Sequence, residues 1–397
     1  MNILIYIPLT AHYSYKNLLL LSLYLSPADK VTILTFDKAI LTNRSILNSE
    51  VNVIHKSYPQ DPSDAQDPNT SNIIRRIRFW RHVKNIAADF EKYDVLVLDN
   101  DVTIDGYTFS KKIPSFVLHS AMDVFNATTI ITKHRYRGSK YFLYPLKILE
   151  KWIGYKFLPR LSDEFQEFNF TELLIDRLFG WDAKGTRRGL GPSVGLMLSG
   201  KGFGYEYEKI GVDIDKIHIT GVPQYDDYFK AKKHGYKALK KSPILFFNSS
   251  TSNPDKGMLK VVSEIRNNFS NKIIIAGHPR ATPTVKSFLS DVANKVENVE
   301  VMLDKRSDDE NKKLLLNAYF LVQRHSSVGL YAMAAKIPIL SYSSVFEHPF
   351  DEMYFFLNSK YHARSPAGLP DIIKKFSADL NNESMDKHLA EDSDFVL

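Results

Sequence analysis

Two short loops in the second half of the chain carry residue types that bind phosphate. The first loop is His278-Pro279-Arg280, and the second is His325-Ser326-Ser327. Imidazole, guanidinium and hydroxyl groups all donate hydrogen bonds to phosphate oxygens. The free N–H groups at the beginning of a helix also favour an anion. The two loops together predict a binding site for a nucleotide or a sugar phosphate.

Each loop follows an apolar run that is typical of a buried parallel strand, Lys272–Gly277 for the first loop and Tyr319–Val322 for the second. A helical pattern follows each loop. Strand, loop and helix in this order place both loops at the carboxyl edge of one sheet, where open α/β folds bind their ligands. The simpler interpretation is that His278-Pro279 is a turn that ends a strand and that Ser326 caps a helix.

Two further segments favour the same chemistry. Asn248-Ser249-Ser250 directly follows an apolar run and is expected to face the same phosphate, although Asx and Ser turns explain such a loop equally well. The glycine-rich turn Ser199–Gly204 lacks the spacing of a Walker A or GxGxxG motif. It contains Lys201, which with His325 is the candidate for binding a sugar carboxylate.

An aspartate pair suggests a different enzyme. The apolar run Val95–Leu98 ends in Asp99-Asn100-Asp101, and such a D-x-D motif resembles the metal and nucleotide site of single-domain GT-A transferases. That interpretation leaves the strand and helix units after residue 243 without a role. We therefore predict no metal site and no required cofactor.

The elements that position these residues alternate between strand and helix patterns. The strands predicted in the first half are Asn2–Ile7, Lys30–Thr35, Glu50–His55, Asp94–Leu98, Pro114–Leu118, Val194–Leu198 and Lys216–Thr220. Those predicted in the second half are Pro243–Phe247, Lys272–Ala276, Val299–Leu303, Tyr319–Val322 and Ile337–Ser341. Helices are predicted over Tyr15–Tyr24, Ile73–Tyr93, Gly204–Gly211 and Leu369–Leu380. This alternation is typical of parallel sheets.

The chain length predicts two domains, because 397 residues exceed one ordinary core. We expect a GT-B-like α/β fold of two Rossmann-type domains, residues 1–228 and 229–397, with parallel sheets that face a central cleft. A lysine-rich bridge, Tyr228–Ser242, joins them, and the last helix packs back on the first domain. Segment 120–190 is predicted as a helical insertion of the first domain, which we expect to be the acceptor side.

The amino-acid composition and net charge indicate which classes of binding partner to expect. Hydrophobic residues make up 44% and charged residues 24%, cysteine is absent, and the net charge is +7. These values predict a soluble cytoplasmic protein with an anionic partner. Dispersed basic residues without a recognition motif argue against nucleic acid. The basic and aromatic segment Lys140–Lys156 suggests peripheral contact with an anionic membrane, or a buried helix with snorkelling lysines.

Three motifs resemble bacterial GT-B glycosyltransferases that use CMP-activated acidic sugars. They are Gly277-His278-Pro279, the Ser326-Ser327 pair 48 residues after His278, and Ile219–Asp226. The HP and SS motifs resemble those of bacterial sialyltransferases and of the β-Kdo transferases of capsule and O-antigen synthesis. The third also resembles CDP-glycerol polymerases. The resemblance implies transfer of an acidic sugar to a surface polysaccharide or lipid-linked glycan.

Two differences from the motifs of other GT-B enzymes bear on which sugar donor is expected. In many UDP- and GDP-sugar GT-B enzymes, a glutamate follows the loop that corresponds to His325-Ser326-Ser327, which we call the serine loop. In this chain, Ser326–Ala332 contains no acidic residue. The acidic-acidic-Gly motif of sialyltransferases is also absent, since Phe165 follows Asp163-Glu164. The resemblance therefore favours CMP-Kdo over UDP-sugars and over CMP-sialic acid.

The resemblance to retaining β-Kdo transferases implies that Asp226 is the nucleophile of a double displacement. Either Glu164 or Glu150 would then activate the acceptor hydroxyl. A helix-capping role explains Asp226 equally well. The alternatives are a sialyltransferase, a CDP-glycerol transferase, a nucleotide-sugar epimerase, or a non-catalytic nucleotide-sugar-binding module of a larger assembly protein.

Overall fold

The computed structural model describes residues 1–8, 15–57, 73–101, 103–119, 188–209, 211–233, 241–248, 253–255, 257–304, 306–324, 326, 328–342, 359–363, 368–380 and 382–396. The chain divides into two compact units. The first comprises Met1–Asp123 and Ile131–Gln224, and the second comprises Val124–Ile130 and Tyr225–Leu397.

The first unit is built on a parallel sheet of seven strands in the order β3-β2-β1-β4-β5-β6-β7. The strands are β1 (Asn2–Ile7), β2 (Lys30–Thr35), β3 (Asn52–His55), β4 (Val95–Leu98), β5 (Ser115–Leu118), β6 (Gly195–Leu198) and β7 (Ile217–Ile219). The side chains of β1 and β4 are almost completely buried. Burial on both faces explains their continuous apolar runs.

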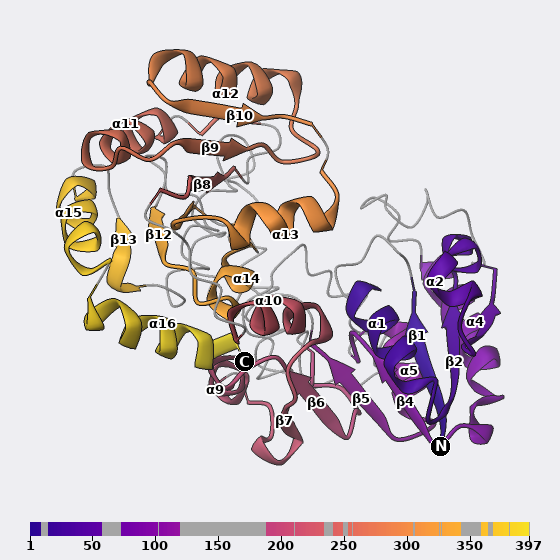
Figure 1. The fold of residues 1–397 in the computed structure, drawn as a ribbon. Coiled ribbons are helices and arrows are strands. Elements are labelled where there is room, and N and C mark those ends of the chain that lie inside the picture. Colours follow the sequence, from indigo (N-terminus) through magenta and orange to yellow (C-terminus); the bar gives the residue numbers. More distant parts are fainter. Residues whose placement is uncertain are drawn as a thin grey trace, which may run out of the picture. The chain divides into compact units, whose positions relative to one another are not determined.

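Most helices of this unit connect successive strands, and α10 follows the last strand, β7 (Figure 1). They are α1 (Tyr15–Leu25), η1 (Lys38–Thr42), α2 (Arg44–Leu47), α4 (Ile73–Ala87), η2 (Phe90–Lys92), α5 (Ile104–Ser110), α9 (Lys201–Lys209), η4 (Ile214–Lys216) and the first residues of α10 (Pro223–Lys233). The helix expected over 73–93 ends earlier, at Ala87, and a 3₁₀ turn leads into β4.

The second unit contains a parallel sheet of six strands in the order β10-β9-β8-β11-β12-β13. The strands are β8 (Ile244–Phe247), β9 (Ile273–Ala276), β10 (Val299–Met302), β11 (Leu321–Gln323), β12 (Ile339–Tyr342) and β13 (His362–Ala363). This order is that of a Rossmann sheet, and its direction reverses between β8 and β11. The order β3-β2-β1-β4 of the first unit has the same reversal, between β1 and β4.

The helices of the second unit are the rest of α10, α11 (Met258–Asn268), α12 (Pro283–Lys295), α13 (Asp308–Leu316), α14 (Val328–Ala334), η6 (Ser359–Tyr361), α15 (Leu369–Asp379) and α16 (Glu383–Val396). Buried residues of α11, α12 and α15 form one hydrophobic core with β8, β9, β11 and β12. A capping box of Ser307 and Glu310 begins α13. Such a box satisfies two N–H groups that the helix leaves free.

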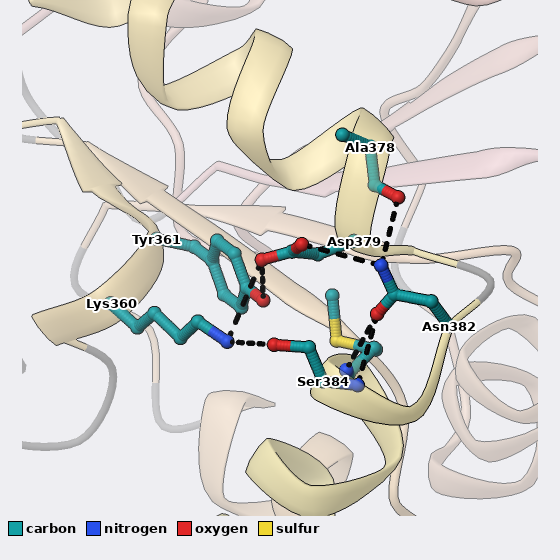
Figure 2. Close-up of polar contacts among 7 residues, drawn as sticks. Lys360, Tyr361, Ala378, Asp379, Asn382 and Ser384 are labelled. Carbon is teal, nitrogen blue, oxygen red and sulfur yellow. Dashed lines mark hydrogen bonds and ion pairs between the residues drawn. The ribbon is translucent and has the colours of Figure 1, made fainter.

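A polar cluster joins the last elements of the second unit (Figure 2). Lys360 Nζ donates to Ser384 Oγ at 2.7 Å and lies 3.5 Å from Asp379 Oδ2. Tyr361 O–H donates to the same Asp379 oxygen at 2.9 Å. The cluster thus fastens η6 to the end of α15 and the beginning of α16. Helix α15 contacts α11 and α16 of its own unit, so its packing on the first domain stays a prediction.

The two parallel α/β sheets expected from the sequence are confirmed. The first part of the bridge predicted over Tyr228–Ser242 is helical, because α10 continues to Lys233, and residues 234–240 lie outside the described residues. Pro223 starts this helix with a preset backbone angle, which the sequence interpretation overlooked. Residues 120–187 of the predicted insertion, including Lys140–Lys156, lie outside the described residues. Among the described residues, no helix is both long and apolar enough to cross a membrane.

Candidate functional site

Polar residues follow three neighbouring strands at the carboxyl edge of the second sheet. Asn248 follows β8, His278 follows β9 by one residue, and Arg324 follows β11. Strand β8 pairs with both β9 and β11, so the loops after β9 and β11 start roughly 10 Å apart. This edge includes the reversal of strand order, the usual ligand position of such sheets. The predicted shared edge of the two loops is confirmed.

His278 lies in a tight turn whose hydrogen bonds determine which ring nitrogen carries the proton. Its Nδ1 accepts the backbone N–H of Arg280 at 3.1 Å, and its carbonyl oxygen accepts the N–H of Ala281 at 2.9 Å. The pKa of the His278 imidazole is lowered mainly by burial and, to a smaller extent, by the positive charge of Arg280. A neutral imidazole that accepts at Nδ1 carries its proton on Nε2. His278 therefore presents one N–H donor.

The expectation that His278 opens a helix is wrong. Helix α12 begins only at Pro283, and its N-cap is Thr282, whose hydroxyl accepts from Val285 N–H at 3.5 Å. The turn after His278 uses Pro279 and Arg280, both of them exposed. A phosphate at this loop would meet the imidazole and the Arg280 side chain, because the free N–H groups of α12 come later in the chain.

Ser326 lies two residues before the first residue of α14, Val328, close to the helix start as predicted. Its Oγ accepts the N–H of Val328 at 3.3 Å, and its carbonyl oxygen accepts the N–H of Gly329 at 3.0 Å. The hydroxyl therefore helps to begin α14, which agrees with the simpler capping interpretation. Its own proton has no acceptor among the described residues, so the O–H group can still donate to a ligand. His325 and Ser327 lie outside the described residues.

A close contact explains why a glycine, Gly329, lies in the first turn of α14. A Cβ atom on Gly329 would lie 2.4 Å from Nε2 of Gln323. Gln323 is the last residue of β11 and is 1% exposed, so it has little room to move. Its Oε1 has no hydrogen-bond partner among the residues that the structure describes. Glycine lets the first turn of α14 lie directly on the end of the strand.

A buried ion pair lies at the same edge and was missed by the sequence interpretation. Arg324 Nη1 lies 3.8 Å from Asp255 Oδ2, and the two side chains are 10% and 2% exposed. Asp255 also accepts the O–H of Tyr342 at 2.6 Å and the N–H of Gly257 at 3.0 Å. The guanidinium thus lies close in sequence to Ser326, with the Asp255 carboxylate as its counter-ion. The signal in the sequence was a basic residue directly after an apolar strand.

Lys201 lies in the first unit, as the exposed first residue of α9. The predicted strand, turn and helix are present, because β6 ends at Leu198 and α9 begins at Lys201. The role of Lys201 toward a sugar carboxylate stays a prediction.

Asp226 is exposed in the first turn of α10. A carboxylate at this position stabilises the helix N-terminus, so its capping explanation remains open. The helix is well held: Asn17 Oδ1 accepts the N–H of Gln224 at 3.1 Å. Tyr225 and Tyr228 of α10 pack on Tyr331 of α14 with ring centroids 5.2 and 4.9 Å apart. The helix of Asp226 thus packs on the helix that follows the serine loop.

The D-x-D aspartate Asp101 has a structural role. Its carboxylate accepts the N–H of Gly189 at 2.8 Å and the hydroxyl of Ser193 at 2.5 Å. Burial raises the pKa of Asp101. The described residues contain no group of three His, Cys, Asp or Glu side chains that could hold a metal ion. Glu164 and Glu150 lie outside the described residues.

No protein-family model matches the chain, and no curated protein matches its sequence. Solved structures do resemble it. A glycosyltransferase from Rickettsia africae gives a TM-score of 0.53 at 12% identity over 99% of this chain and 92% of that chain. Phytolacca americana UGT2, solved with UDP-2-fluoro-glucose and pterostilbene, gives 0.56 at 11% identity over 99% and 94%.

The UDP-GlcNAc 2-epimerase from Methanocaldococcus jannaschii gives a TM-score of 0.55 at 13% identity, covering 97% of this chain and 94% of that chain. Identities this low show the fold alone. The fold is GT-B-like, with two Rossmann-type parallel-sheet domains, as expected from the sequence.

Proposed function

We propose that this chain is a glycosyltransferase that binds the nucleotide of an activated sugar at the carboxyl edge of its second sheet. The observation that carries the proposal is the geometry of His278, a half-buried neutral imidazole with Nδ1 occupied by the N–H of Arg280. Its Nε2–H is a fixed donor for a departing phosphate. The hydroxyl of Ser326 and the guanidinium of Arg324 lie in the loop after β11, at the same edge of the sheet, and favour the same negative charge.

The donor we propose is CMP-Kdo, and the acceptor a bacterial surface polysaccharide or a lipid-linked glycan. The order of the HP and SS motifs supports this choice, as does the absence of an acid in Ser326–Ala332. UDP is the main competitor, because the Phytolacca americana protein was solved with a UDP-sugar. A cytoplasmic protein in peripheral contact with an anionic membrane would meet both substrates.

In the proposed reaction a carboxylate oxygen of Asp226 attacks the anomeric carbon of the sugar. The bond from that carbon to the phosphate oxygen breaks, and its electron pair leaves with CMP. His278 donates a hydrogen bond to the phosphate as its charge grows. The acceptor hydroxyl then attacks the glycosyl ester, its proton passes to Glu164 or Glu150, and the Asp226 carboxylate is released. Two inversions give net retention.

A nucleotide panel tests the site. The melting temperature of the chain is measured with CMP, CDP, UDP and GDP, and a ligand at a hundredfold excess over its Kd stabilises by about 2.7 kcal/mol. We expect the largest shift with CMP and a smaller one in His278→Ala. A preference for UDP would overturn the CMP-Kdo donor, and no shift with any nucleotide would overturn the site itself.

Asp226→Asn tests the nucleophile. We expect it to abolish sugar transfer while CMP binding persists, because the phosphate contacts lie on the loops of the sheet edge. Incubation of wild-type protein with donor should leave a sugar adduct on the peptide Gly221–Lys230, visible by mass spectrometry. Asp227→Asn is the matched control, since Asp227 is equally exposed on the same helix turn but binds Lys312 Nζ at 2.6 Å. Transfer by Asp226→Asn at a tenth of the wild-type rate or more would refute the assignment.

An epimerase is the second candidate, favoured by the similarity to the Methanocaldococcus jannaschii enzyme. Incubation with UDP-GlcNAc followed by NMR distinguishes the two, because epimerisation gives a new UDP-sugar without an acceptor. Slow release of free nucleotide and sugar instead indicates a transferase that hydrolyses its donor. A chain that binds nucleotide and converts no donor would be a binding module.

A further inference from the structure

Arg306 makes four hydrogen bonds on the segment between β10 and α13. Its Nη2 donates to the carbonyl oxygen of Gly277 at 3.0 Å. Its Nη1 donates to the carbonyl oxygens of Met302 at 2.8 Å and Asp304 at 3.3 Å. Its Nε donates to Oδ1 of Asn311 at 3.0 Å. One guanidinium thus connects the ends of β9 and β10 with the first turns of α13.

The carbonyl that Arg306 holds belongs to the peptide bond between Gly277 and His278. The N–H of Gly277 donates to the carbonyl oxygen of Met302 at 3.0 Å, the same oxygen that Nη1 binds. Both polar groups of Gly277 are therefore tied to the β10 side. Because a peptide bond is planar, fixing the Gly277 carbonyl also fixes the backbone N–H of His278. The direction in which the His278 side chain leaves the strand depends on this plane.

Only arginine can make this set of contacts. Its planar group carries five N–H donors at fixed angles, whereas a lysine ammonium is a single point with three rotating donors. The next residue, Ser307, begins the capping box of α13 and accepts the N–H of Glu310 at 3.2 Å. The backbone of Arg306 is thus held from the helix side while its side chain holds the turn after β9.

We propose that Arg306 is a positioning residue that sets the direction of the His278 Nε2–H toward the donor phosphate. It acts through the Gly277–His278 peptide bond and not by touching the substrate. The orientation of His278 is a property of the fold. The consequence for catalysis rests on the proposed function.

The test compares Arg306→Gln and Arg306→Lys with a matched control, Arg266→Gln. Arg266 Nη1 also donates to two backbone carbonyl oxygens, those of Phe269 and Asn271, each at 3.3 Å. These contacts lie before the amino end of β9, at the opposite end of the strand from His278. Both glutamine variants remove a guanidinium that holds the backbone around β9, and only one of them touches the turn of His278.

The first readout is the ¹⁵N–¹H spectrum of the imidazoles, with the signal of His278 identified by its loss in His278→Gln. We expect one tautomer, protonated at Nε2, and a pKa below the ordinary histidine value in wild type and in Arg266→Gln. In Arg306→Gln we expect a mixture of tautomers and a pKa closer to the ordinary value. Arg306→Lys should resemble the glutamine variant. An unchanged His278 signal in Arg306→Gln, or an equal change in Arg266→Gln, would overturn the proposal.

The second readout is turnover of the sugar donor. We expect Arg306→Gln to lower kcat roughly 10- to 100-fold, as small misplacement of a catalytic group does. In a His278→Ala background the same change should cost little more, because both act on one contact. Additive losses would overturn the coupling of Arg306 to His278. If the imidazole signal responds as expected but His278→Ala keeps wild-type turnover, the phosphate role in the proposed function fails and the positioning stands.

Discussion

Replacing Asp255 with asparagine tests whether a buried ion pair organises the carboxyl edge of the second sheet. The Asp255 carboxylate accepts the O–H of Tyr342 at 2.6 Å, and its Oδ2 lies 3.8 Å from Nη1 of Arg324. Asparagine has nearly the same shape and keeps one acceptor oxygen. The change therefore removes the charge that faces Arg324 and leaves most of the packing intact.

The expected loss follows from the burial of the pair. Removing one partner of a buried ion pair costs about 3–5 kcal/mol. The separation of 3.8 Å is longer than a hydrogen bond, so we expect the lower limit, about 3 kcal/mol. Each 1 kcal/mol lowers the melting temperature by roughly 2–4 °C in a unit of 150–250 residues. Asp255→Asn should therefore lower it by roughly 6–12 °C.

Tyr342→Phe provides the matched comparison. It removes only the O–H group, a hydrogen bond to a charged acceptor that contributes about 1.5–3 kcal/mol. Thermal unfolding of the full chain, followed by circular dichroism, measures both variants and the double mutant. Because both changes alter the same hydrogen bond, from Tyr342 O–H to Asp255 Oδ2, the double mutant should lose less than the sum of the two changes. A smaller loss in Asp255→Asn than in Tyr342→Phe, or simple additivity, would refute the central role of the carboxylate.

Two further predictions concern the second unit. Burial lowers the pKa of His388, so the unfolded chain binds this proton more readily, and stability should fall as the pH decreases below about 6.5. Urea unfolding between pH 5 and 8 checks this, and His388→Phe, which keeps a ring against Tyr361, should show a weaker pH dependence. Gly329→Ala should destabilise by about 1–3 kcal/mol because its Cβ overpacks the buried Gln323. An unchanged melting temperature would show that Gln323 moves freely.

The sheets could be predicted because buried parallel strands are written as apolar runs. Predicted and observed strands overlap throughout, with ends shifted by a residue or two, as for Ile337–Ser341 against β12. Strand β13 was missed because two residues, His362 and Ala363, form no run. It is defined by its partner strand, with Ser341 Oγ and His362 Nδ1 2.9 Å apart. Such pairing is not visible in local sequence.

The supporting residues of the site could not be predicted for a related reason. Asp255 follows Pro254 and precedes Gly257 by two residues, so it resembles an ordinary turn aspartate, while its partner Tyr342 is 87 residues away. Arg306 belongs to no motif, and the carbonyl that it holds is 29 residues away. Motifs at strand ends mark groups that face a ligand. The groups that hold them in place depend on contacts that form only when distant strands become neighbours.

Both units bury an aspartate near the carboxyl edge of the sheet, and the two differ in what they face. Asp101 accepts hydrogen bonds from the N–H of Gly189 and the hydroxyl of Ser193, and burial raises its pKa. Asp255 instead faces the guanidinium of Arg324, with Nη1 3.8 Å from its Oδ2. A buried cation therefore lies at the second edge, beside the serine loop. Together with the half-buried His278 imidazole at the same edge, this guanidinium is a reason to expect the phosphate on the second sheet.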